Sequence, residues 1–224
     1  MIKTPYLLFL GDAPDHLAAK VAQGIKDWRP DNAVGQLRLD GCKADLGLTD
    51  MTLAQAKEAG AKTLVIGVAN RGGTISATWR AVLVEALEAG FDLASGLHNL
   101  LRNEPELVAA AEKHGRTLHD VRIPSVQYPI ANGVKRTGKR VLAVGTDCSV
   151  GKMYTALALD AAMKEKGLKC SFRATGQTGI LITGEGVPLD AVIADFMAGS
   201  IEYLTPDNDD DHWDIIEGQG SLFH

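Results

Sequence analysis

The chain has 224 residues, of which 46% are hydrophobic and 23% are charged. These fractions are typical of globular proteins, and they exclude a generally disordered chain because enough apolar surface is available to form a core. The net charge of −5 argues against a general nucleic-acid-binding protein, which would carry a surplus of lysine and arginine. At roughly 100–200 residues per domain, the length corresponds to one large domain or two small ones.

The cysteines and the first residues indicate where the protein resides. Cys42, Cys148 and Cys170 are an odd number with no CxxC spacing, which is typical of reduced thiols in the cytosol. The first apolar run, 6–10, ends at Gly11 and Asp12, too soon for a signal peptide or a membrane span. We therefore expect a cytoplasmic protein with neither a membrane nor a nucleic acid as its partner.

Short apolar runs bounded by glycine or aspartate predict buried parallel strands. They occur at 6–10, 35–39, 63–67, 140–144, around 170–172, and at 215–216. Helical patterns lie between most of these runs: 15–28, 77–89 between Ser76 and Gly90, 104–114, 151–166, and one that Pro188 opens toward Tyr203. Alternating strands and helices predict an α/β fold with doubly wound parallel sheets.

One boundary divides the predicted elements. Pro124, Pro129, Gly133 and Gly138 interrupt any helical pattern, and a new strand begins at Arg140. We predict a Rossmann-like α/β domain over residues 1–125, a linker over 126–138, and a P-loop-containing domain over 139–224. The second domain is expected to be incomplete at its C-terminus, because a parallel P-loop sheet usually needs more elements to cover both faces.

The strongest motif is a phosphate loop. The strand at 140–144 is followed by Gly145-Thr146-Asp147-Cys148-Ser149-Val150-Gly151-Lys152, and a helix begins there. This is the G-x-x-x-x-G-K pattern in the strand–loop–helix context that it requires. Backbone N–H groups, the positive end of the helix and the Lys152 charge together form a cradle for a di- or triphosphate.

The residues after this lysine depart from the usual pattern. A nucleotide hydrolase has Ser or Thr next, to hold Mg²⁺. Here Met153 follows, then Tyr154 and Thr155, and a thioether is a poor ligand for a hard cation. The pattern therefore favours a pyrophosphate that is bound and not cleaved, such as that of coenzyme A, and no metal is expected.

Two further segments follow strands of the second domain, where ligands bind in open α/β sheets. After the strand around 170–172, Arg173 could clamp a carboxylate or phosphate, with Gln177 and Thr178 as neutral donors, or the segment could be a solvated loop. After the last strand, Glu217 enters a Gly-rich loop, a position that in P-loop proteins orients a metal or water or serves as a base. In the first domain no G-x-G-x-x-G pattern indicates a nicotinamide cofactor.

The chain resembles a known family in three segments. They read GTDCSVGKMYTAL from Gly145, RATGQTGILITGEGVPLDAVIADFMAG from Arg173, and IIEGQGSL from Ile215. The first is similar to the phosphate loop of dethiobiotin synthetase, which has Thr after the lysine. Together the three are closer to the D-glutamate N-acetyltransferase family, formerly of unknown function, which joins a Rossmann-like domain to a P-loop domain. The resemblance covers essentially the whole chain, and family members continue past residue 224.

This resemblance implies acetyl transfer from acetyl-CoA to the amine of D-glutamate. We also expect the protein to be a homo-oligomer, specifically a dimer. The cofactor would lie on the phosphate loop and the start of its helix, with Arg173, Gln177 and Thr178 at the substrate carboxylates. The base would be Glu217 or Asp147. The residues expected at the cofactor are Gly145, Thr146, Cys148, Ser149, Val150, Gly151, Lys152, Met153, Tyr154 and Thr155.

Two other functions are compatible with the phosphate loop. One is an ATP- and Mg²⁺-dependent ligase or kinase resembling dethiobiotin synthetase, with the metal held by Thr155 or Glu217. The other is a regulator that binds a nucleotide without turning it over. A requirement for Mg²⁺ with consumption of nucleotide distinguishes the ligase from the acetyltransferase, and any turnover excludes the regulator.

Overall fold

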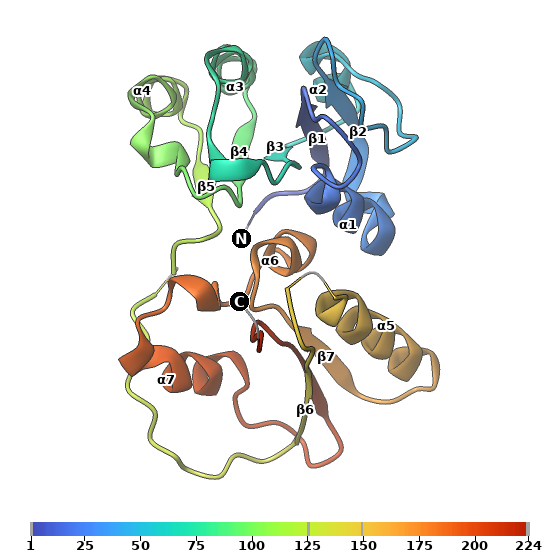
Figure 1. Cartoon of the computed structure of the whole chain (residues 1–224), viewed down its shortest axis with the longest axis vertical. Coiled ribbons are helices and arrows are strands. Elements are labelled where there is room, and N and C mark those ends of the chain that lie inside the picture. Colours follow the sequence, from blue (N-terminus) through green and yellow to red (C-terminus); the bar gives the residue numbers. More distant parts are fainter. Residues whose placement is uncertain (1, 125, 149, 223–224) are drawn as a thin grey trace. The chain divides into compact units, whose positions relative to one another are not determined.

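The computed structural model describes residues 2–124, 126–148 and 150–222, which form two compact units, 1–121 and 122–224 (Figure 1). Each unit contains a parallel sheet with helices packed against it, so the predicted α/β class is confirmed. Within the described residues no helix is long and apolar enough to cross a membrane.

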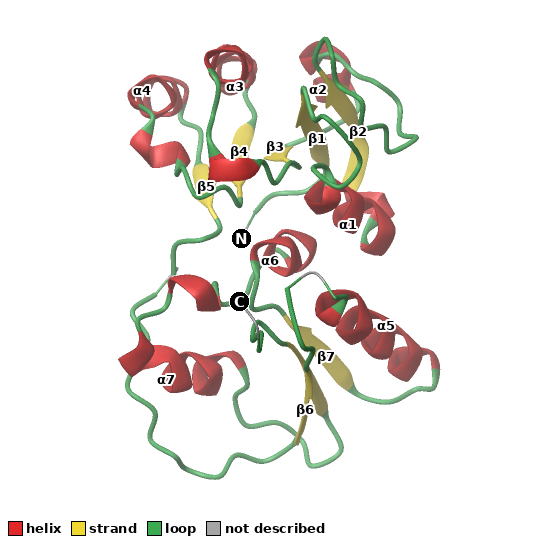
Figure 2. Ribbon diagram, in the orientation of Figure 1, coloured by secondary structure: helices red, strands yellow, loops and turns green. Residues whose placement is uncertain are grey.

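The first unit has a five-stranded sheet with the order β2-β1-β3-β4-β5, and all of its strand pairs are parallel (Figure 2). β1 lies inside the sheet and all six of its residues are buried, as its apolar sequence predicts. The strands are β1 (Tyr6–Gly11), β2 (Ala33–Arg38), β3 (Thr63–Ile66), β4 (Asp92–Ser95) and β5 (Leu118–Asp120). The helices are α1 (Lys20–Trp28), α2 (Leu53–Glu58), α3 (Ala77–Ala89) and α4 (Pro105–His114), with short 3-10 turns at Pro30–Asn32, Arg71–Gly73 and Leu101–Asn103.

Local capping sets the ends of α3 where the sequence predicts them. The Ser76 hydroxyl accepts the Trp79 N–H at 3.2 Å, and Gly90 ends the helix in the left-handed region with φ of 97°. By contrast, α1 begins five residues later than expected. The Asp15 carboxylate accepts the Ala18 N–H at 2.8 Å, which holds this segment in a turn.

The second unit has a three-stranded parallel sheet with the order β6-β8-β7. β8 (Trp213–Glu217) is the central strand, between β6 (Lys139–Ala143) and β7 (Cys170–Arg173). The helices are α5 (Lys152–Glu165), α6 (Gln177–Thr183) and α7 (Ala194–Leu204). The segment that the sequence predicts as one helix from Pro188 is a 3-10 turn, Leu189–Ala191, followed by α7. Val192 and Ile193 between them are extended, and Val192 packs against the core of Tyr128, Val187 and Leu204.

The segment predicted as a linker, 126–138, packs along α7. Tyr128 is buried in this core, and the Glu202 carboxylate of α7 accepts the N–H groups of Asn132 and Gly133 at 3.0 and 2.9 Å. Arg136 donates to the carbonyls of Glu202, in the last turn of α7, and of Thr205, directly after the helix. These contacts satisfy backbone groups at the C-terminal end of α7, where a cation is also favourable for the helix dipole.

Candidate functional site

Three loops follow the carboxyl ends of the three strands in the second sheet. They lie together because the strands are parallel, so these ends are at the same edge of the sheet. We name them loop A (144–151, after β6), loop B (174–176, after β7) and loop C (218–222, after β8). In open α/β sheets this edge is where ligands bind. Most of the site residues predicted from the sequence lie in loop A or in the first turn of the helices that follow loops A and B.

Loop A has the form of a phosphate loop. Gly151 ends it with φ of 100°, a conformation that favours glycine, and α5 begins at Lys152. A Cβ on Gly145 would lie 2.6 Å from Cγ2 of Val150, so the loop is tightly closed there. The Lys152 Nζ donates to the Asp147 carbonyl at 2.6 Å and thus lies over the loop. A positive side chain at the start of a 14-residue helix is the charge arrangement that binds phosphate groups.

The remaining predicted cofactor residues surround the same helix start. Met153 is half-buried, whereas Tyr154 and Thr155 are exposed and Thr155 donates its N–H to the Gly151 carbonyl at 2.9 Å. Thr146, Cys148 and Val150 are exposed in loop A. Ser149, also predicted to contact the cofactor, lies outside the described residues. Within the described part of the chain, no group of three or more His, Cys, Asp or Glu could hold a metal ion.

Loop C is fastened to loop A. The Leu222 N–H donates to the Thr146 carbonyl at 3.0 Å, and the Ser221 hydroxyl donates to Oδ1 of Asp147 at 3.2 Å. The same Asp147 oxygen accepts the Cys148 N–H at 2.6 Å. The Asp147 carboxylate is half-buried and joins both loops. The contribution of Ser221 was missed in the sequence, where its only signal is its position in the loop after a strand.

Glu217, at the end of β8, points between loop B and α6. Its side chain is buried, and Oε2 accepts the N–H groups of Thr175 and Gly176 at 3.0 and 3.1 Å. Burial raises the pKa of Glu217 above its usual value, although these two N–H groups, the Gln219 side chain and the Lys152 charge each act to lower it. Glu217 therefore lies at the carboxyl edge of the sheet, as predicted, but its side chain is buried against the backbone of loop B.

The Gly-rich segment that follows loop B is a helix, α6, and not a continuation of the loop. Gly176 caps α6, and Gln177 and Thr178 lie half-buried in its first turn. The apolar residues Ile180, Leu181 and Ile182 are all buried. They are the sequence signal for this helix, which the surrounding glycines obscured.

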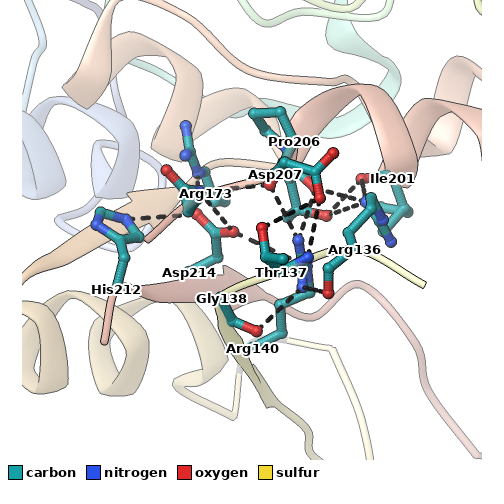
Figure 3. Close-up of polar contacts among 12 residues, drawn as sticks. Arg136, Thr137, Gly138, Arg140, Arg173, Ile201, Pro206, Asp207, His212 and Asp214 are labelled. Carbon is teal, nitrogen blue, oxygen red and sulfur yellow. Dashed lines mark hydrogen bonds and ion pairs between the residues drawn. The ribbon is translucent and has the colours of Figure 1, made fainter. Parts of the chain in front are cut away.

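Arg173 points away from these loops. Its Nε donates to Oδ1 of Asp214 at 2.7 Å, and Nε of Arg140 lies 3.9 Å from the other oxygen of that carboxylate (Figure 3). Asp214 is at the start of β8, three residues before Glu217, which corresponds to roughly 10 Å along a strand. The structure therefore gives no support to Arg173 as the clamp for substrate carboxylates. Side-chain direction, which the sequence does not reveal, decides this.

A parallel α/β sheet with this strand–loop–helix arrangement defines the second unit as a P-loop domain. Two family models match the chain. One is described as the P-loop domain of a domain of unknown function, DUF1611, and matches residues 129–224; the other is the Rossmann-like domain of the same family and matches residues 37–124.

Relatives of known name match over the whole chain. A D-glutamate N-acetyltransferase from Tritonibacter scottomollicae is 82% identical over 224 residues, and one from a Pseudoalteromonas species is 53% identical over 223. In both comparisons the match covers 100% of this chain and 67% of the relative. A crystal structure of a DUF1611 family protein from Anabaena variabilis is 33% identical, with a TM-score of 0.80 over 99% of this chain and 67% of that one.

The chain belongs to the DUF1611 family, which includes these D-glutamate N-acetyltransferases, and the family resemblance predicted from the sequence is confirmed. It spans about two thirds of the length of the relatives that it matches.

Proposed function

We propose that this protein transfers an acetyl group from acetyl-CoA to the amino group of D-glutamate. The observation that carries the proposal is the 82% identity, over all 224 residues, to a protein of that name. Loop A supports it independently, because a phosphate cradle without Ser or Thr after its lysine suits a pyrophosphate that is held and not cleaved.

The chain's own residues supply two parts of this chemistry. Lys152 and the first N–H groups of α5 would hold the pyrophosphate of the donor. Asp147, half-buried in loop A, would accept the proton that the amine loses. The amine nitrogen forms a bond to the thioester carbonyl carbon, the carbon–sulfur bond breaks, and the sulfur leaves as the thiol after gaining a proton. Gln177 and Thr178 remain the proposed contacts for the amino acid.

The test measures free thiol released from acetyl-CoA in the presence of D-glutamate, L-glutamate or neither, with EDTA throughout. We expect release with D-glutamate only, accompanied by N-acetyl-D-glutamate detected by mass spectrometry. Turnover that needs ATP and Mg²⁺ in place of acetyl-CoA would establish the ligase or kinase instead. No turnover with either donor would favour the nucleotide-binding regulator. The dimer and the cytoplasmic location remain predictions.

Lys152→Ala is expected to weaken binding of coenzyme A by about 10- to 150-fold, because a hydrogen bond from a charged group is worth roughly 1.5–3 kcal/mol. Isothermal titration calorimetry measures the affinity. Lys166→Ala is the matched control, since Lys166 is exposed just after the other end of α5 and should leave affinity unchanged. Equal affinities for Lys152→Ala and the wild type would remove loop A as the phosphate site.

Met153→Thr is expected to leave acetyl transfer largely intact and to create no requirement for Mg²⁺. The substitution restores the hydroxyl that nucleotide hydrolases have after the lysine, yet a transferase that does not cleave the phosphates gains nothing from a metal there. Rates in EDTA and in Mg²⁺ are compared for both proteins. A wild-type activity that collapses in EDTA and recovers with Mg²⁺ would contradict this expectation.

A further inference from the structure

A buried group of hydrogen bonds joins loop B to the end of β8. Thr175 is fully buried, and its hydroxyl donates to the Glu217 carbonyl at 2.6 Å while accepting Nε2 of Gln219 at 3.0 Å. The Glu217 carboxylate accepts the Thr175 and Gly176 N–H groups. Thus three hydrogen bonds join loop B to Glu217 and a fourth joins it to Gln219 of loop C, and we call the group of Thr175, Glu217 and Gln219 the clasp.

The carboxylate of the clasp is poorly placed to remove a proton from a substrate. Only 6% of Glu217 is exposed, and one oxygen already accepts two N–H groups. A Cβ on Gly179 would lie 2.5 Å from Oε2, so α6 packs directly against the carboxylate. A general base must come within about 2.6–3.2 Å of the atom that carries the proton, and at Oε2 the backbone of loop B and α6 occupies that space.

The clasp contacts the residue at which α6 begins, because the Glu217 carboxylate accepts the N–H of the N-cap, Gly176. Loop B ends at Gly176, and the next residues are Gln177 and Thr178, the proposed contacts for the amino acid. A buried polar group with all its partners satisfied is rigid, because breaking one bond leaves a donor or acceptor unpaired in the interior. Glycine at 176 and 179 allows this close approach, since a Cβ at either would lie within 3.0 Å of Glu217 or Gln219.

We propose that Glu217 is a positioning residue and not the proton acceptor, and that with Thr175 and Gln219 it fixes the start of α6 for binding of the amino acid substrate. This rests on the proposed acetyl transfer for the identity of the substrate, whereas the clasp itself is independent of it.

The kcat and KM values of Glu217 and Thr175 variants test whether Glu217 positions α6 or accepts the proton. In Glu217→Gln the amide oxygen can still accept both N–H groups, so we expect kcat to fall by less than about 10-fold, far from the 10²–10⁴-fold loss of a general base. Thr175→Val removes both hydrogen bonds of the hydroxyl. We expect it to raise KM for D-glutamate by at least about 2- to 10-fold, the effect of losing one such bond, with affinity for coenzyme A unchanged. Thr175→Ser keeps the hydroxyl and should restore most of the wild-type KM. Glu185→Gln, at an exposed glutamate after α6, is the matched control.

Amide hydrogen exchange tests the clasp without any activity. The Thr175 and Gly176 amides should be protected in the wild type and exchange at least tenfold faster in Thr175→Val and Glu217→Ala, but not in Thr175→Ser or Glu185→Gln. Unchanged protection in the first two variants would overturn the clasp. A loss of kcat of two orders of magnitude in Glu217→Gln, with KM and protection unchanged, would make Glu217 the base. A wild type that exchanges as expected but does not transfer acetyl groups would refute only the proposed function.

Discussion

Asp214→Ala is expected to lower the free energy of unfolding of the second unit by about 3–5 kcal/mol, the range for removing one partner of a buried ion pair. Only 1% of the Asp214 side chain is exposed, and it lies between Arg173 at 2.7 Å and Arg140 at 3.9 Å. Without the carboxylate, two arginine side chains that are 22% and 21% exposed would lose the negative charge beside them. Urea unfolding at neutral pH, followed by a probe in the second unit such as Trp213, measures the change.

Two further variants test whether the unpaired arginine charges cause the loss of stability in Asp214→Ala. Asp211→Ala removes an exposed carboxylate that pairs with Lys169, and it should change stability by no more than about 0.5 kcal/mol. Adding Arg173→Met to Asp214→Ala should recover part of the loss, because one unpaired buried charge is removed with it. A loss below about 1 kcal/mol for Asp214→Ala would mean that solvent, and not Asp214, balances the two arginines.

Asp147→Asn is expected to lower kcat for acetyl transfer by about 10²–10⁴-fold, the range that a general base contributes. Asparagine has nearly the same shape, and its Oδ1 can still accept the Cys148 N–H and the Ser221 hydroxyl. Loop A should therefore keep its form while losing the basic group. Steady-state kinetics with acetyl-CoA and D-glutamate measures kcat, and calorimetry with coenzyme A should show little change in affinity.

The control for this substitution is Asp195→Asn, which makes the same chemical change at an exposed residue in the first turn of α7. It should retain wild-type kinetics. If Asp147→Asn keeps kcat within about threefold of the wild type, the proton acceptor is another group, and Asp147 serves only to join loops A and C. A large fall in affinity for coenzyme A would instead show that the charge change disturbs the phosphate loop.

The amino-acid sequence was enough to determine the ends of α3, the position of the phosphate loop and the α/β class of this protein. The Ser76 cap and the Gly90 stop of α3 depend on residues within a few positions, and so does the G-x-x-x-x-G-K spacing that places Lys152 at the start of α5. The alternation of apolar strands and helices determined the α/β class for a similar reason. In these cases local sequence and local structure coincide, because the hydrogen bonds concerned join near neighbours.

Tertiary structure alone decided the partners of the charged and polar side chains around the second sheet. Arg173 and Asp214 are 41 residues apart, and Thr175 and Gln219 are 44 apart. Each pair meets because β7 and β8 are neighbours in register, with Cys170 beside Trp213. Whether Arg173 turns toward the loops or back along the strand depends on where a buried carboxylate lies. That position follows from the order of strands in the sheet and not from any spacing along the chain.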